Sequence, residues 1–152
     1  MKHILVVTLM SVFVLDYASA GEPAALTTLR AKFPQGIPWN VEISDPSGQN
    51  LASLQFRITS ESAASCLGDF GADAVRVEFV RTEHVSPDIR LASYGVAQFT
   101  GDKVEIDLTG GICDAYLIMD GKMETDGSST GTVFRMGMAG GHDIGTYRAT
   151  VK

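Results

Sequence analysis

The sequence predicts an all-β protein: a small antiparallel meander of about eight strands that closes into a β-barrel and is preceded by a short N-terminal helix. Apolar and polar residues alternate repeatedly after Gly36, as they do in half-buried strands. Turn-forming residues recur at close intervals, and no long helical segments alternate with the strands. The alternative, a two-sheet β-sandwich, needs a long crossover that only residues 59–73 supply, so we favour the barrel.

Residues 1–20 are typical of a signal peptide. They combine a basic start, an apolar run over residues 4–15 and small residues before a cleavage site near Ala20. The apolar run is shorter than the ~20 residues that a helix needs to span a bilayer. We therefore expect a periplasmic or extracellular protein whose mature part, residues 21–152, is a single β-barrel-like domain, monomeric and not membrane-spanning.

The predicted helix covers residues 22–33, at the start of the mature chain. Leu26, Leu29 and Phe33 recur there at helical spacing, and Pro34 follows them. This spacing indicates one short amphipathic helix before the first strand.

The first predicted hairpin joins strands at residues 39–43 and 54–58 across the turn-forming residues 45–50. The alternation is then lost over residues 59–73. That segment contains Cys66, in a stretch that fits one helical turn.

A further strand is expected at residues 75–79, followed by a polar loop at 83–88. A two-residue turn at Gly101 and Asp102 then aligns the apolar residues of two antiparallel strands, pairing Phe99 with Val104 and Ala97 with Ile106. The opposite face pairs Gln98 with Glu105 and Val96 with Asp107, and we expect this face to be solvated.

Two more hairpins are predicted toward the C-terminus. The Asp120-Gly121 pair is a strong type I′ turn signal, which separates a strand at residues 112–119 from a shorter one at 122–125. The last hairpin has either a four-residue loop at residues 140–143 or a two-residue turn at Gly140 and Gly141. Both choices place Phe134 on the inner face with Tyr147, and Arg135 on the outer face.

The two cysteines of the chain, Cys66 and Cys113, are expected to form a disulfide, because an oxidising compartment favours pairing of two otherwise lone thiols. The alternative, a nucleophilic cysteine, needs a setting that lowers the thiol pKa, and the sequence shows none.

Composition and motifs exclude several classes of function. The formal net charge of -6 opposes the phosphate neutralisation that nucleic-acid binding requires, so no nucleic-acid partner is expected. The sequence contains no zinc-binding spacing, no nucleophile elbow, no phosphate-binding loop and no EF-hand. We therefore predict no catalytic residues, no metal and no cofactor.

Four residues are the candidates for ligand binding: Trp39, Asp114, Tyr116 and His142. Asp114 adjoins a strand that is apolar on both faces, and a buried carboxylate there requires a partner or a ligand. The alternative places Asp114 at the start of that strand, beside the disulfide. His142 belongs to a glycine-rich turn that is otherwise an ordinary solvated loop, and Trp39 and Tyr116 are either core aromatics or ligand-stacking groups.

These observations favour an exported, non-enzymatic binding module. It is either a carrier of a small apolar ligand held inside the barrel or an inhibitor of a secreted hydrolase. Small inward residues such as Ala97 and Ala149 allow a hollow interior, but bulky neighbours such as Phe56 are able to fill it. The alternatives are a small hydrolase or isomerase with its site at the barrel mouth, and a structural component of the cell envelope.

Overall fold

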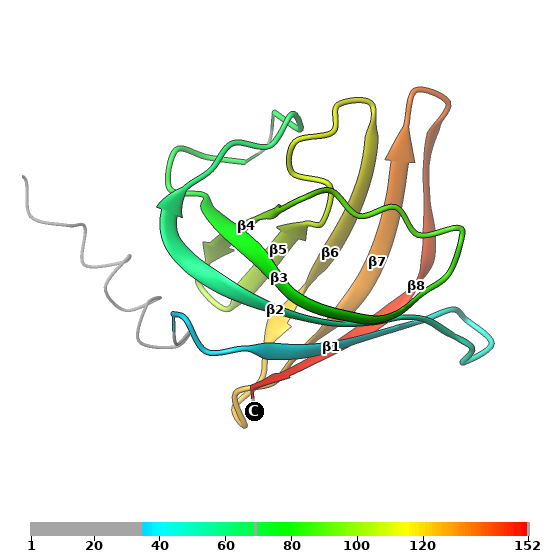
Figure 1. The fold of residues 1–152 in the computed structure, drawn as a ribbon, viewed down its shortest axis with the longest axis horizontal. Coiled ribbons are helices and arrows are strands. Elements are labelled where there is room, and N and C mark those ends of the chain that lie inside the picture. The colour runs from blue at the N-terminus through cyan, green and yellow to red at the C-terminus, as the bar shows by residue number, and fades with distance from the viewer. Residues whose placement is uncertain (1–34, 69, 152) are drawn as a thin grey trace, which may run out of the picture.

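The strands of the protein form one closed antiparallel barrel, seen in a computed structural model that describes residues 35–68 and 70–151 (Figure 1). Each strand pairs with the next along the chain, and β8 pairs with β1 to close the barrel. The strands are β1 (Trp39–Ser44), β2 (Asn50–Ser62), β3 (Val75–Val85), β4 (Gly95–Thr100), β5 (Lys103–Asp107), β6 (Ala115–Met123), β7 (Ser129–Gly137) and β8 (Gly140–Val151). The predicted all-β barrel is confirmed.

The predicted signal peptide and the predicted helix at residues 22–33 lie outside the described residues. Within the described part of the chain there is no helix, so the helical turn expected around Cys66 is not formed. Instead, β2 continues to Ser62 and an irregular loop leads to β3. The polar loop expected at residues 83–88 is also corrected, because β3 runs on to Val85.

The first predicted hairpin is formed. Trp39 faces Phe56 and Val41 faces Leu54, and all four side chains are buried inside the barrel. The turn that joins β1 to β2 is held by Asp45, whose carboxylate accepts hydrogen bonds from the Ser47 and Gln49 amides. The period-two pattern therefore identified both the strands and their inward face.

The β4–β5 hairpin has the predicted register, but its outer face is not solvated. Val96 pairs with Asp107 as expected, yet both side chains are 0% exposed. The β5–β6 loop folds back over this face, where Gly110 packs so closely that an added Cβ would lie 3.0 Å from Val96 Cγ2. The alternation of residues within each strand does not predict whether a loop covers the outer face of the sheet.

The predicted turn at Asp120-Gly121 is wrong, because β6 runs straight through both residues. Gly121 instead pairs with Gly131 on β7, and a Cβ on Gly121 would collide with the carbonyl oxygen of Thr130. Glycine is needed here for the close approach of two strands rather than for a turn. The chain turns later, where the Asp126 carboxylate accepts hydrogen bonds from the Ser128 amide and hydroxyl.

The β7–β8 hairpin turns earlier than predicted, at Met138 and Ala139, and β8 has a bulge at Ile144, between the partners of Val133 and Phe134. Because this bulge shifts the pairing by one residue, the two faces of β7 are reversed relative to the prediction. Phe134 points away from the core and is 37% exposed. Arg135 pairs with Leu117, a buried core residue, and so lies on the inner side of the sheet.

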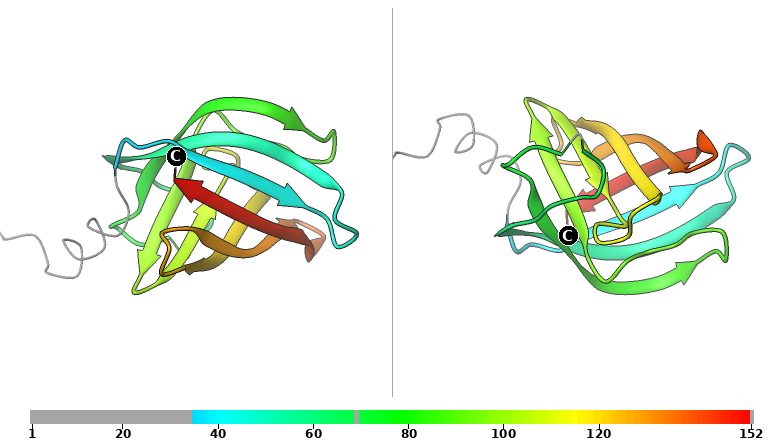
Figure 2. Two further views of the ribbon diagram at one scale, coloured as in Figure 1. Left: turned by 90° about the horizontal axis from the view of Figure 1, so that it is seen from below. Right: turned by 90° about the horizontal axis from the view of Figure 1, so that it is seen from above.

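The order of the strands brings four loops to one end of the barrel. Figure 2 shows β8 between β1 and β7 where the barrel closes. The loops β1–β2, β3–β4, β5–β6 and β7–β8 all follow odd-numbered strands, and in an up-and-down barrel they belong to the same end. We call this end the loop end.

Candidate functional site

The interior of the barrel is filled by side chains. A cavity of about 10 Å³ lies among the inward residues, which corresponds to roughly one water molecule. It is lined by Trp39, Phe56, Ile58, Val104, Ile106, Met119, Ser129, Tyr147 and Ala149. Trp39, one of the predicted ligand-binding residues, is 2% exposed and belongs to this core.

Two polar groups meet inside this apolar core. The Tyr147 hydroxyl and Ser129 Oγ lie 2.9 Å apart in a buried hydrogen bond. Burial raises the pKa of Tyr147 to about 12, since the charged phenolate is disfavoured away from water. The hydrogen bond satisfies both hydroxyl groups without admitting solvent.

A much larger pocket, of about 630 Å³, opens at the loop end. Its walls come from the β3–β4 loop, the β5–β6 loop, the start of β6 and the β7–β8 hairpin. Residues of the lining include Pro87, Asp88, Arg90, Thr109, Asp114, Tyr116, Leu117, Arg135, Met136, Met138, Ala139 and His142. We call it the loop-end pocket.

Three of the four predicted site residues line the loop-end pocket, namely Asp114, Tyr116 and His142. Asp114 is exposed and directly precedes β6, next to the disulfide, with a left-handed φ of 68°. Tyr116 is half-buried on β6, and His142 is exposed on β8. The fourth residue, Trp39, lies in the filled interior and does not contribute to this pocket.

Sequence reasoning missed the two arginines of the pocket, Arg90 and Arg135. Arg135 pairs with His142 across the β7–β8 hairpin, so the two side chains share one face. The predicted register had assigned Arg135 to the outer face, because it did not include the bulge at Ile144 of β8. Arg90 comes from the exposed β3–β4 loop, whose path strand periodicity does not predict.

The charged groups of the pocket are not paired with one another. In the described part of the chain, the ion pairs of arginine involve Arg57, Arg76 and Arg81, with glutamates as partners. Neither Arg90 nor Arg135 has a carboxylate partner there, although Asp88 and Asp114 also line the pocket.

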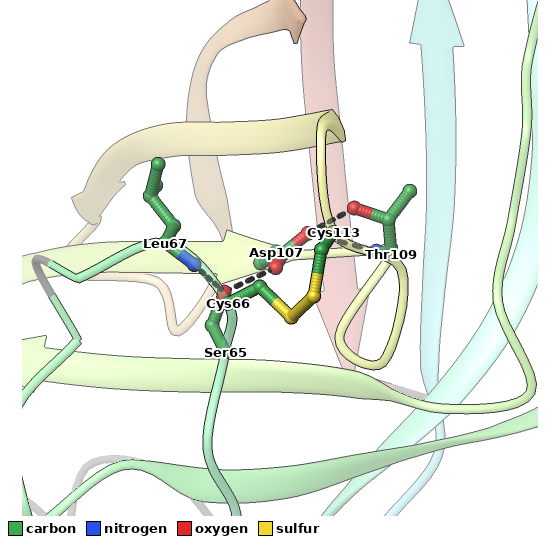
Figure 3. The surroundings of a disulfide bond; sticks show 6 residues. All are labelled: Ser65, Cys66, Leu67, Asp107, Thr109 and Cys113. Atoms are coloured by element: carbon green, nitrogen blue, oxygen red, sulfur yellow. Dashed lines mark hydrogen bonds between the residues drawn. A yellow bond between two sulfur atoms is a disulfide. The ribbon is translucent and has the colours of Figure 1, made fainter.

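The disulfide between Cys66 and Cys113 confirms the predicted pairing and ties the β2–β3 loop to the β5–β6 loop (Figure 3). Asp107 lies beside it and accepts hydrogen bonds from Ser65 Oγ at 2.6 Å and from the Thr109 amide at 2.8 Å (Figure 3). The Thr109 hydroxyl donates a third bond to this carboxylate, at 2.5 Å. Together the disulfide and Asp107 fix the loop that carries Asp114.

Two further observations bear on the kind of site. Between residues 35 and 151, leaving out residue 69, His, Cys, Asp and Glu residues form no group of three or more able to hold a metal ion. Over the same residues, no helix has the length and apolar character to cross a membrane.

No protein-family model matches the chain, and no curated protein or solved structure shows significant similarity to it.

Proposed function

We propose that this chain is an exported, non-enzymatic binding module that holds its ligand in the loop-end pocket and not inside the barrel. The observation that carries the proposal is the contrast between the two cavities. The cavity among the inward core residues has about 10 Å³, whereas the loop-end pocket has about 630 Å³. Pockets that hold small ligands have volumes of roughly 300–1,000 Å³.

The construction of the pocket supports this role. Its walls are anchored by β6, β7 and β8, and the disulfide restrains the β5–β6 loop. A site with restrained walls loses less conformational entropy when a ligand binds. The disulfide is also compatible with the oxidising compartment that the signal peptide predicts.

A native mass spectrum of the mature protein, purified from the exporting cells without reductant, tests the proposal. We expect a small-molecule adduct on the wild-type protein. Ala139→Trp places a bulky side chain on the pocket wall at an exposed turn position and should remove the adduct. Thr125→Trp is the matched control, because Thr125 is equally exposed but lies between β6 and β7, at the other end of the barrel.

An adduct that survives in Ala139→Trp contradicts the proposed location. Loss of the adduct in Ala97→Phe would then identify binding inside the barrel, since Ala97 is a buried member of the barrel core. Protein that is empty in all variants contradicts a small ligand and favours a protein partner.

Inhibition of a secreted hydrolase is the second candidate, and one observation favours it. The β7–β8 hairpin projects from the barrel (Figure 1), and Met138 at its turn is 90% exposed. An exposed apolar side chain on a narrow hairpin suits insertion into an enzyme cleft. Met138→Asp should weaken inhibition of a susceptible protease, lipase or lysozyme about ten-fold or more. Val80→Asp, at another exposed apolar residue, should leave inhibition unchanged.

A small hydrolase or isomerase would use the same pocket, with Asp114, Tyr116 or His142 as the reacting groups. Turnover of an ester, peptide or glycoside panel, abolished by His142→Ala and by Asp114→Asn, would establish that alternative. An adduct without turnover supports the binding module instead.

A further inference from the structure

We infer that the ligand of the loop-end pocket carries one carboxylate group, bound by Arg135 with His142 and Arg90, beside an apolar body. The inference rests on the proposed binding role and specifies its ligand class.

The position of Arg135 is the first step. Arg135 is half-buried on β7, and its cross-strand neighbours are Leu117, which is 3% exposed, and His142. A half-buried guanidinium on a pocket wall is partly desolvated, and an anion that accepts its hydrogen bonds stabilises it. No acidic side chain of the described residues supplies that anion. A ligand carboxylate fits, because guanidinium and carboxylate form two parallel hydrogen bonds.

The formal charges of the pocket side chains disfavour a multiply charged anion as the ligand. Two arginines, Arg90 and Arg135, line it together with two aspartates, Asp88 and Asp114, so their formal charges cancel. Asp88 lies on the β3–β4 loop, and Asp114 lies beside the end of β7, where its carbonyl oxygen would be 3.3 Å from a Cβ on Gly137. A ligand with one carboxylate needs only the guanidinium of Arg135 as its partner, whereas a polyphosphate would also meet the two aspartates.

The rest of the lining favours an apolar ligand body. Leu117 belongs to the barrel core and reaches the pocket, and Pro87, Met136 and Met138 add apolar surface around it. Burial of hydrocarbon against these side chains supplies affinity, while the arginine fixes the orientation of the ligand.

An NMR titration of the intact ¹⁵N-labelled protein tests the inference with octanoate, octanol and octylamine, which share one hydrocarbon chain. Octanoate should shift the amide signals of β7, β8 and the β3–β4 loop, and octanol should bind about ten-fold more weakly. A peptide terminus carries the same group, so N-acetyl-leucyl-leucine and its C-terminal amide form a second pair. Whichever acid binds more tightly identifies the source of the carboxylate.

Substitutions of Arg135 test its role in binding the carboxylate, and a substitution of Arg148 is the matched control. Arg135→Gln should weaken binding of the acid about ten-fold while leaving octanol unchanged, and Arg135→Lys should restore part of the loss. Arg148→Gln removes an exposed arginine of β8 that does not line the pocket, and it should have no effect. Unchanged spectra of the free variants show that the fold is retained.

Equal binding of octanoate and octanol would overturn the carboxylate inference and leave the proposed binding role intact. Preference for octylamine, or octanoate binding that persists in Arg135→Gln, would overturn it as well. If none of the probes shifts the pocket signals, the inference also falls, and the native mass spectrum decides the proposed function separately.

Discussion

Asp107 is the residue whose environment departs most from its sequence context. It follows Glu105 by two positions on a strand with a polar outer face, yet its side chain is 0% exposed and accepts three hydrogen bonds. Two of these bonds come from Thr109 and one from Ser65, on loops that adjoin the disulfide. The carboxylate replaces solvent as the acceptor for both loops.

Asp107→Ala should lower the free energy of unfolding by about 2–4 kcal/mol, because it leaves buried donors without an acceptor. Glu105→Gln, on the same strand and face, is the control, with an expected change of at most about 0.5 kcal/mol. Urea unfolding followed by tryptophan fluorescence measures both, since Trp39 reports on the core. Equal stability of the two variants would show that Asp107 does not hold the loops.

Tyr147 gives the protein a specific alkaline sensitivity. Its pKa is raised from 10.0 to about 12, chiefly by burial, so the folded protein holds the phenolic proton more tightly than the unfolded chain does. This contribution to stability is complete below pH 10 and is lost as the pH rises from 10 toward 12. It amounts to up to about 3 kcal/mol.

Tyr147→Phe tests this by removing the titrating group. We expect it to lower stability at pH 8 by about 1 kcal/mol through loss of the bond to Ser129, but to reduce the further loss between pH 10 and pH 12. Urea midpoints across that range, compared with the wild type, supply the measurement. An identical alkaline decline in both proteins would assign it to other groups.

At the scale of elements, the glycines show that a two-residue turn motif does not by itself decide whether a strand ends. Asp120-Gly121 has the composition of a type I′ turn, but β6 continues through it because Gly121 crosses Gly131 at very short range. Gly121→Asn should therefore be strongly destabilising, by about 2–4 kcal/mol or more, although asparagine is well tolerated in a type I′ turn.

Gly127→Asn is the comparison for this prediction. Gly127 occupies a real turn with φ of +81° and has no atom within 4 Å of an added Cβ, so the cost should stay near 1 kcal/mol. Chemical denaturation of the two variants measures the difference. A mild effect at Gly121 would indicate that the strands can separate there.

The sequence predicted elements well where each strand has one buried and one polar face. The strands of the first hairpin and the register of β4 with β5 follow from such alternation. Prediction failed at β7, because a bulge at Ile144 of β8 shifts the pairing by one residue and places Arg135, not Phe134, on the inner side. A bulge inserts one residue into the pairing without an obvious change in composition, so the period-two rule continues on the wrong face.

The same limit explains the partial prediction of the site. Asp114, Tyr116 and His142 were recognised from their unusual local settings, and the structure brings them to one pocket. Trp39 was singled out as an aromatic, but burial of aromatics is the general rule and carries no information on ligands. Arg90 and Arg135 depend on loop path and register, which a single sequence does not specify.

At the scale of the whole molecule, the disulfide links two loops that the strand pairing leaves independent. Cys66 and Cys113 are 47 positions apart, and closing a loop of that size contributes about 4 kcal/mol on the chain-entropy model. The Cys66→Ser/Cys113→Ser double variant should lose stability of this order, measured by urea unfolding without reductant. A double variant as stable as the oxidised wild type would contradict the estimate. Reduction of the wild type should give the same loss.

Closure of the barrel has a consequence for how the chain folds. The last pairing, of Trp39 with Val151, joins the first described strand to the final one, so β1 keeps an open hydrogen-bonding edge until β8 has been made. Contacts between such distant parts of the chain are slow to form. During synthesis the nascent protein therefore remains open, and the moment at which β8 emerges sets the earliest time at which the native state can exist.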